Sequence, residues 1–167
     1  MAFPYFVEKA APVSGLPGMI SCQCLYRGRV SHKETTVSRR DADFSVAVSV
    51  PVSTVCPCSR AISERGAHNQ RGIVTVELEL GPFFWLEDII ALVENAASSP
   101  VYSLIKREDE KYITEHAYDN PKFVEDLVRD VFYKIREMNQ FPRFSVEAEN
   151  FESIHNHSAY AFVEFSG

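Results

Sequence analysis

Two cysteines separated by a single proline stand in the segment V-S-T-V-C-P-C-S-R, residues 52–60. Cys56 and Cys58 share one connection with His68, which we call the cysteine loop (residues 56–68). Thiolate and imidazole are ligands that zinc prefers, and a thiolate is also a nucleophile. The spacing C-x-C…H is not a standard zinc-finger spacing, however, and free cysteines are commonly buried without a chemical role. Residue types alone therefore leave a metal site, a nucleophile and a structural pair open.

Two other segments carry side chains suited to metal binding or proton transfer. The run R-E-D-E-K, residues 107–111, is typical of a solvated charged face, although Glu110 is also a candidate hard oxygen ligand. Near the chain end, Glu152, His155 and His157 crowd the segment E-N-F-E-S-I-H-N-H-S. Two surface histidines would give the same pattern. The segment supplies acid–base groups if the fold turns it toward the cysteine loop across a sheet.

Composition indicates one ordinary globular domain spanning residues 1–167. The chain is 46% hydrophobic and 24% charged, so it has enough apolar surface for a core, and no apolar run approaches the roughly 18 residues of a membrane span. Its start has no basic segment followed by an apolar one, so we expect a cytoplasmic protein that does not bind a membrane. The net charge of -6 disfavours general nucleic-acid binding but leaves a small anionic ligand open. In a reducing compartment, the four cysteines are expected to be thiols.

Alternating apolar residues predict two long strands, at 44–52 and 74–80, on either side of the cysteine loop. Residues 143–149 and 158–165 predict a further antiparallel pair. Residues 19–30 are interpreted as an edge strand.

Apolar residues at helical spacing predict helices between these strand pairs. One helix covers residues 86–93, and a second runs from Pro121 to about residue 138, with Asn120 as its N-cap. Glu125 lies beside its apolar stripe, where an acid in the first turn favourably meets the helix dipole and needs no other role. Pro100 is expected to open a short third helix. The grouping of strands, helices and strands predicts an α+β fold, an antiparallel sheet with helices on one face.

Four long motifs resemble the type IB GTP cyclohydrolases, a family of prokaryotic enzymes. They are F-P-Y-F-V-E-K-A-A-P-V-S-G, V-P-V-S-T-V-C-P-C-S-R-A-I-S-E-R-G-A-H-N-Q-R-G, K-R-E-D-E-K-Y-I-T-E-H-A-Y-D-N-P-K-F-V-E-D and E-N-F-E-S-I-H-N-H-S-A-Y-A. Together they cover essentially the whole chain. Members of the family are usually longer, with a tandem half before F-P-Y-F, so this chain resembles their C-terminal half.

The resemblance implies a tunnelling fold, in which several subunits close their sheets into a β-barrel and active sites lie between subunits. The expected assembly is a homo-oligomer, either a tetramer or a dimer of dimers. The expected substrate is GTP. The implied reaction opens its imidazole ring with release of formate and then forms a pterin ring, giving 7,8-dihydroneopterin triphosphate.

The resemblance also implies roles for individual residues. Cys56 is similar to the metal-binding thiolate of the family, and Cys58 is similar to its essential catalytic cysteine. His68 and Glu110 match positions that line the metal site. Glu125 resembles the glutamate that anchors the guanine edge. The expected metal is a divalent transition ion, because a mixed thiolate, imidazole and carboxylate site admits zinc, manganese or iron(II).

Glu152 and His155 match polar groups around the reacting ring and are expected to act in catalysis. Cys22 and Cys24 lie outside the motifs and are interpreted as structural. Two other functions stay open. One is an enzyme like the deazapurine nitrile reductases, with Cys58 as its nucleophile, and the other is a metal-binding or assembly subunit without catalysis.

Overall fold

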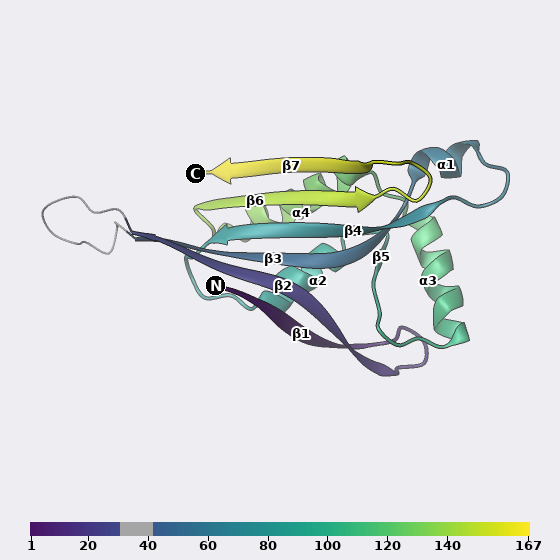
Figure 1. Cartoon of the computed structure of the whole chain (residues 1–167), viewed down its shortest axis with the longest axis horizontal. Helices are drawn as coiled ribbons and strands as arrows, with labels where there is room; N and C mark the ends of the chain where they lie inside the picture. Colours follow the sequence, from purple (N-terminus) through teal and green to yellow (C-terminus); the bar gives the residue numbers. More distant parts are fainter. Residues whose placement is uncertain (31–41) are drawn as a thin grey trace, which may run out of the picture.

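The computed structural model describes residues 1–30 and 42–167, which form a twisted sheet with helices packed beside it (Figure 1). In chain order the elements are β1 Ala2–Ala10, β2 Pro17–Val30, β3 Ala42–Val55, α1 Pro57–Ile62, β4 Asn69–Glu79, α2 Leu86–Glu94, β5 Ser99–Pro100, α3 Arg107–Asp119, α4 Val124–Met138, β6 Arg143–Phe151 and β7 Ser158–Ser166.

The seven strands of the described residues belong to one sheet. Its order is β1-β2-β3-β4-β6-β7, with the short β5 paired to β3. All pairings are antiparallel. β2 pairs with β3 as far as Ser49. Further along the same edge of β3, the short β5 pairs with Val52 and Ser53. The long central strands β3 and β4 therefore carry the cysteine loop at one end of the sheet.

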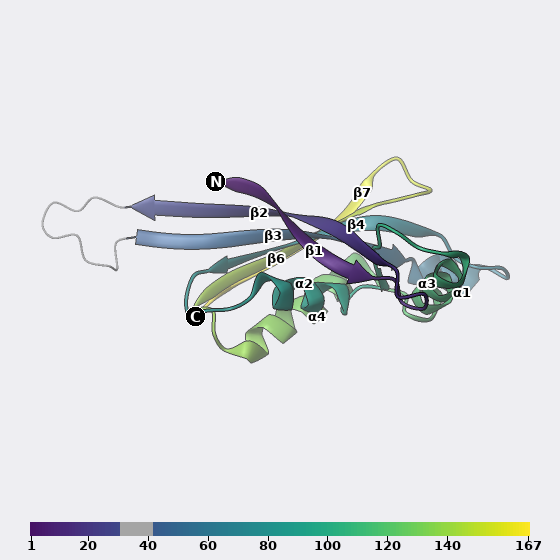
Figure 2. The ribbon, with the colours of Figure 1, turned by 90° about the horizontal axis from the view of Figure 1, so that it is seen from below.

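The core lies between one sheet face and the helices. Side chains alternate between the two faces of a strand, and the register sets Val46 opposite Leu78 and Val48 opposite Val76, so every second residue of β3 and β4 points into the core. Figure 2 shows α2 and α4 below the sheet, on that side. Full burial of each such Val or Leu contributes about 1.5–3 kcal/mol.

Helices α2 and α4 cover the sheet through their apolar stripes. Leu127, Val131 and Ile135 of α4 recur every four residues and are buried, as are Ile89 and Val93 of α2. Within the described ranges, no helix is long and apolar enough to cross a membrane. The structure confirms the predicted α+β class, the antiparallel sheet and the helices on one of its faces.

The predicted strands at 44–52, 74–80, 143–149 and 158–165 are confirmed as parts of β3, β4, β6 and β7. The strand predicted at 19–30 exists as β2, but its assignment to the sheet edge is wrong. The N-terminal motif forms β1, which pairs with β2 on its outer side. Its odd-numbered residues are half-buried and its even-numbered residues are exposed. This alternation of burial is weak, and the segment forms an edge strand because it pairs with β2.

The predictions made from two prolines are wrong. Pro100 does not open a helix, because it pairs with Val52 of β3 and extends the sheet. Pro121 does not begin the second predicted helix. Asn120 caps the C-terminus of α3 instead, and the Lys122 N–H donates to the carbonyl of Val55, so the chain stays extended until α4 begins at Val124. Tertiary hydrogen bonds override local capping preference at both positions.

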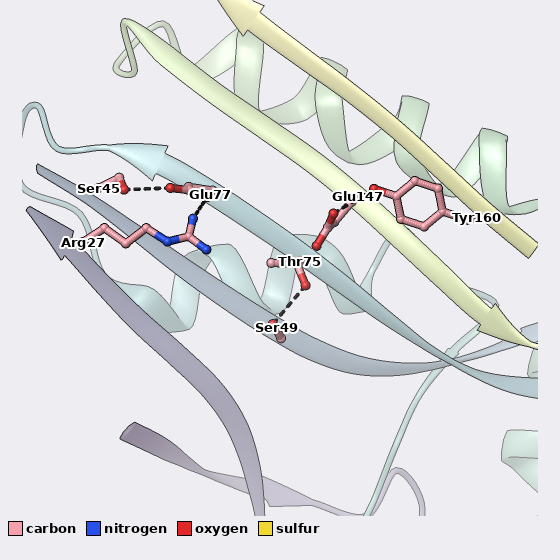
Figure 3. Close-up of polar contacts among 7 residues, drawn as sticks. All are labelled: Arg27, Ser45, Ser49, Thr75, Glu77, Glu147 and Tyr160. Carbon is pink, nitrogen blue, oxygen red and sulfur yellow. Dashed lines mark hydrogen bonds and ion pairs between the residues drawn. The ribbon is translucent and has the colours of Figure 1, made fainter. Parts of the chain in front are cut away.

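The sheet face opposite the helices, which we call the open face, is lined by polar side chains that pair across strands (Figure 3). The pairs are Arg27 with Glu77, Ser45 with Glu77 at 2.7 Å, Ser49 with Thr75 at 2.9 Å and Tyr160 with Glu147 at 2.8 Å. Burial by itself would raise the pKa of Glu77, but the hydrogen bonds from Arg27 and Ser45 outweigh it and lower that pKa. These pairs form a cross-strand polar network on the open face.

One charged residue predicted to lie on a solvated face is buried. Asp109 of α3 is 0% exposed and accepts hydrogen bonds from Lys106 N–H at 2.8 Å, Val13 N–H at 2.9 Å, Ser14 N–H at 2.8 Å and Ser14 Oγ at 2.6 Å. It thereby fastens the turn between β1 and β2 to the start of α3. Burial alone would raise the pKa of this carboxyl, but the hydrogen bonds lower it far below the ordinary value of 3.8.

The variant Asp109→Asn is expected to unfold at a lower urea concentration than the parent at pH 7. Its amide NH2 would face donors that now meet a carboxylate oxygen. Because the folded pKa is depressed, this stabilisation is present above pH 3.8 and is lost as the pH falls below it, so the difference between the two proteins should shrink in acid. Glu108→Gln, at an exposed neighbour, is the matched control. Equal midpoints at pH 7 would contradict the prediction.

Candidate active site around Cys56 and His68

The Cys-Pro-Cys segment turns the end of β3 into the short helix α1. Cys56 is the N-cap residue of α1, and its Sγ accepts a weak hydrogen bond from the Ser59 N–H at 3.5 Å. Pro57 occupies the first helical position, where its missing N–H costs nothing. Cys56 is half-buried against the loop, whereas Cys58 is exposed. The stiff turn therefore gives the two thiols different surroundings.

The cysteine loop closes on itself at His68. The Cys56 N–H donates to the His68 carbonyl at 3.1 Å. Ser59 Oγ donates to the Cys56 carbonyl at 3.1 Å and accepts from the His68 N–H at 3.2 Å. These bonds hold the backbones of Cys56 and His68 side by side, as the shared connection between two paired strands predicts.

The imidazole of His68 joins the cysteine loop to the chain end. His68 Nδ1 lies 3.1 Å from Gln70 Oε1 and 3.3 Å from Ser153 Oγ, which belongs to the connection between β6 and β7. That connection also carries Glu152, which is half-buried, and two exposed histidines. The rings of His155 and His157 stack with centroids 5.1 Å apart. The contact between His68 and Ser153 shows that the predicted acid–base segment reaches the cysteine loop.

The fold of one chain does not bring Glu110 to Cys56 and His68. Glu110 is exposed in the first turn of α3, whereas α1 meets the other end of that helix, where Arg60 lies 3.9 Å from Asp119. Nine residues of helix correspond to about 13 Å along its axis. Within residues 1–30 and 42–167, no group of three His, Cys, Asp or Glu side chains is placed to hold a metal ion. The structure therefore joins Cys56 with His68 and leaves Glu110 apart.

Glu125 lies in the first turn of α4, on the rim of a groove of about 310 Å³ between that helix and β7. Val128, Phe132 and Tyr133 supply its apolar and aromatic wall. Among the described residues, the Glu125 carboxylate has no hydrogen bond or ion pair. The bond from Lys122 N–H to the carbonyl of Val55 places the chain leading into this helix beside the residue before Cys56.

A second groove, of about 460 Å³, is lined by the two residues that contact the His68 ring. Gln70 and Ser153 line it together with Arg71, Tyr102 and Ile113. A larger hollow of about 690 Å³ lies elsewhere, around Arg27, Glu77 and Arg143, and contains none of the candidate residues. The 460 Å³ groove therefore lies next to the two partners of His68, although Cys56, Cys58 and His68 do not line it.

Cys22 and Cys24 lie in the hydrophobic core, as their structural interpretation requires. Their exposed fractions are 0% and 2%. Burial is the main cause that raises the pKa of Cys22 to about 11, and burial also raises the pKa of Cys24. Thiols that remain protonated at neutral pH are poor nucleophiles and ligands, so Cys56 and Cys58 are the two cysteines left as candidates for chemistry.

The family to which this chain belongs follows from its match to a family model. A family model described as type I GTP cyclohydrolase folE2 matches residues 1–161. The chain belongs to the FolE2 family.

Curated relatives of this FolE2-family chain carry the name GTP cyclohydrolase FolE2. The protein of Syntrophus aciditrophicus is 56% identical over 98% of this chain and 62% of its own length. The protein of Syntrophotalea carbinolica is 53% identical over 99% of the chain and 59% of its own length, and that of Geotalea uraniireducens is 52% identical over 97% and 57%. The chain thus spans about three fifths of the length of these relatives.

Two polar partners of His68 in this FolE2-family chain were missed by the sequence reasoning. Gln70 had a detectable signal, because residues two apart in a strand share a face and His68 directly precedes β4. Ser153 had none, since only the pairing of β6 with β4, which sets Asn150 opposite Gly72, brings the start of the β6–β7 connection to His68.

Proposed function

We propose that this chain is a GTP cyclohydrolase that opens the imidazole ring of GTP, releases C8 as formate and forms the pterin ring of 7,8-dihydroneopterin triphosphate. The observation that supports this proposal most is that a backbone hydrogen bond holds the Cys-Pro-Cys turn beside His68 at one end of the sheet. The chain that contains this turn belongs to the FolE2 family. The names of its relatives favour this reaction over a nitrile reductase.

Cys56 and His68 are proposed as two ligands of a divalent transition metal. A half-buried thiol and an imidazole on adjoining backbone are a suitable pair of donors for zinc, manganese or iron(II). Glu110 is proposed as a third ligand, which requires a conformational change or a second chain because α3 holds it apart in this chain. The ion would supply Lewis-acid polarisation and would acidify water that it binds.

The remaining groups are proposed to move protons during the reaction. Water must add at C8 of the purine, and protons must reach the ring nitrogens as the bonds to C8 break. Cys58 projects from the first turn of α1 and is exposed, so its thiol is accessible to a substrate. His155 and Glu152 lie on the connection that contacts His68 through Ser153. We assign these three residues to proton transfer around the reacting ring.

Glu125 is proposed to anchor guanine. Its carboxylate is available in the groove between α4 and β7, beside Phe132 and Tyr133. A carboxylate accepts hydrogen bonds from both the N1 and N2 donors of guanine, whereas adenine has an acceptor at N1. This arrangement would select GTP over ATP.

We further propose a tunnelling fold whose sheet closes with other copies into a barrel, as a tetramer or a dimer of dimers. β1 and β7 are the sheet edges among the described strands, and both alternate exposed and half-buried residues along their length. Phe6 and Phe162 are large, exposed side chains on these strands. A second copy pairing along an edge would satisfy open backbone groups and cover these residues.

The test of this function is a formate-release assay on the purified chain with GTP and each candidate metal, together with its mass by light scattering. Formate formed in equal amount to the pterin product supports a cyclohydrolase. Metal binding and assembly without formate would instead identify a non-catalytic subunit. Reduction of a deazapurine nitrile by a nicotinamide cofactor, without formate release, would favour the nitrile reductase.

A further inference from the structure

We propose that Gln70 is a positioning residue that holds the neutral ring of His68 as its Nδ1–H tautomer and so leaves Nε2 unprotonated. The inference rests on the proposed function in one respect, because Nε2 is then the atom available as a metal donor or proton acceptor. The tautomer itself is a property of the chain and is measurable without metal or GTP.

The geometry begins with the short spacing of the two residues. His68 directly precedes β4, and Gln70 is the second residue of that strand. Gln70 is only 7% exposed, so water competes little for its amide. Its Oε1 lies 3.1 Å from His68 Nδ1, whereas Ser153 Oγ lies 3.3 Å away and belongs to an exposed residue. Gln70 is therefore the better shielded of the two partners.

An amide oxygen only accepts hydrogen bonds, so the ring nitrogen that it faces must donate. If Nδ1 were unprotonated, two lone pairs would face each other across 3.1 Å. The arrangement therefore favours a proton on Nδ1. Because a neutral imidazole carries one proton, the lone pair is then on Nε2.

Gln70 is placed like a residue that orients a histidine ligand without binding the metal itself. A hydrogen bond to one ring nitrogen fixes both the ring orientation and the nitrogen that stays free. Loss of such a bond typically weakens metal affinity by about 10- to 100-fold. Gln70 would thus determine which atom His68 presents without touching the substrate.

The experiment is nuclear magnetic resonance of metal-free protein labelled with nitrogen-15 in its histidines, recorded in alkaline buffer where the rings are neutral. Two-bond proton–nitrogen correlations distinguish the tautomers, and the His68 signals are assigned by their absence from His68→Asn protein. Gln70→Met removes the acceptor at similar length, whereas Gln70→Glu keeps an oxygen acceptor. Ser153→Ala tests the second partner. Zinc affinity is measured on the same preparations.

We expect the Nδ1–H form in the parent, in Gln70→Glu and in Ser153→Ala, and the Nε2–H form, which free histidine favours, in Gln70→Met. Zinc affinity of Gln70→Met should fall by about 10- to 100-fold. An Nε2–H parent overturns the proposal, as does a tautomer unchanged in Gln70→Met. If Gln70→Met does not fold, the parent spectrum and the retained pattern of Gln70→Glu decide. A confirmed tautomer without formate release would count against the cyclohydrolase alone.

Discussion

Cys58→Ala protein is expected to bind its metal and assemble like the parent, yet to release formate from GTP at least about 10²- to 10⁴-fold more slowly. The thiol is exposed in the first turn of α1 and makes no hydrogen bond within residues 1–30 and 42–167. Its removal therefore costs little stability. The expected loss reflects the missing proton-transfer group.

Cys56→Ala should instead lose both metal and turnover. It also removes the Sγ that caps α1, a change that costs about 0.5–2 kcal/mol for the usual capping residues. Cys56→Ser separates the two effects, because serine is a favoured N-cap but its hydroxyl is a poor substitute for a soft thiolate. We expect the serine variant to regain the thermal midpoint but not the metal.

Metal content by elemental analysis, thermal midpoint and formate release on the same preparations distinguish these outcomes. Two structural cysteines would give variants that lose stability but keep full activity per folded molecule. Parental turnover by Cys58→Ala would refute its catalytic role, and parental metal content in Cys56→Ala would refute its role as a ligand.

Glu125→Gln is expected to impair use of GTP by about 1 to 3 kcal/mol or more, which corresponds to a loss of about 5- to 150-fold or more in kcat/KM. The amide would present one donor toward the N1 and N2 donors of guanine, so that one pair of groups could no longer hydrogen-bond. Steady-state kinetics with GTP, together with binding of GTP to metal-free protein, measure the effect.

Asp126→Asn is the matched control for Glu125→Gln. Asp126 is the other acid in the first turn of α4, and it pairs with Arg129 at 2.6 Å rather than facing the groove alone. Both variants weaken the favourable helix-dipole interaction by a similar amount, about 0.3–1 kcal/mol of stability. If both bind GTP as the parent does, Glu125 is only a helix-start acid.

Long periodic segments of this chain were predictable because their period reports burial directly. The alternation of Val46, Val48 and Val50 predicts a strand with one face in the core. The apolar stripe of α4 predicts a helix in the same way. α3 lacks such a stripe and was not predicted. Its one deeply buried acid, Asp109, owes its place to donors from the β1–β2 turn, more than 90 residues earlier in the chain.

The residue types that can do chemistry were identifiable from the sequence, since thiols, imidazoles and carboxylates are recognised without a fold. The sequence also placed Cys56 and His68 together, because a hairpin connection keeps them close. Three relations became visible only in the folded chain: Ser153 contacts His68, Gln70 faces its Nδ1, and Glu110 lies apart on α3. The physical reason is that these relations depend on how the β6–β7 connection and α3 pack against the end of the sheet. Contacts between segments so distant in the chain leave no periodic signal in either one.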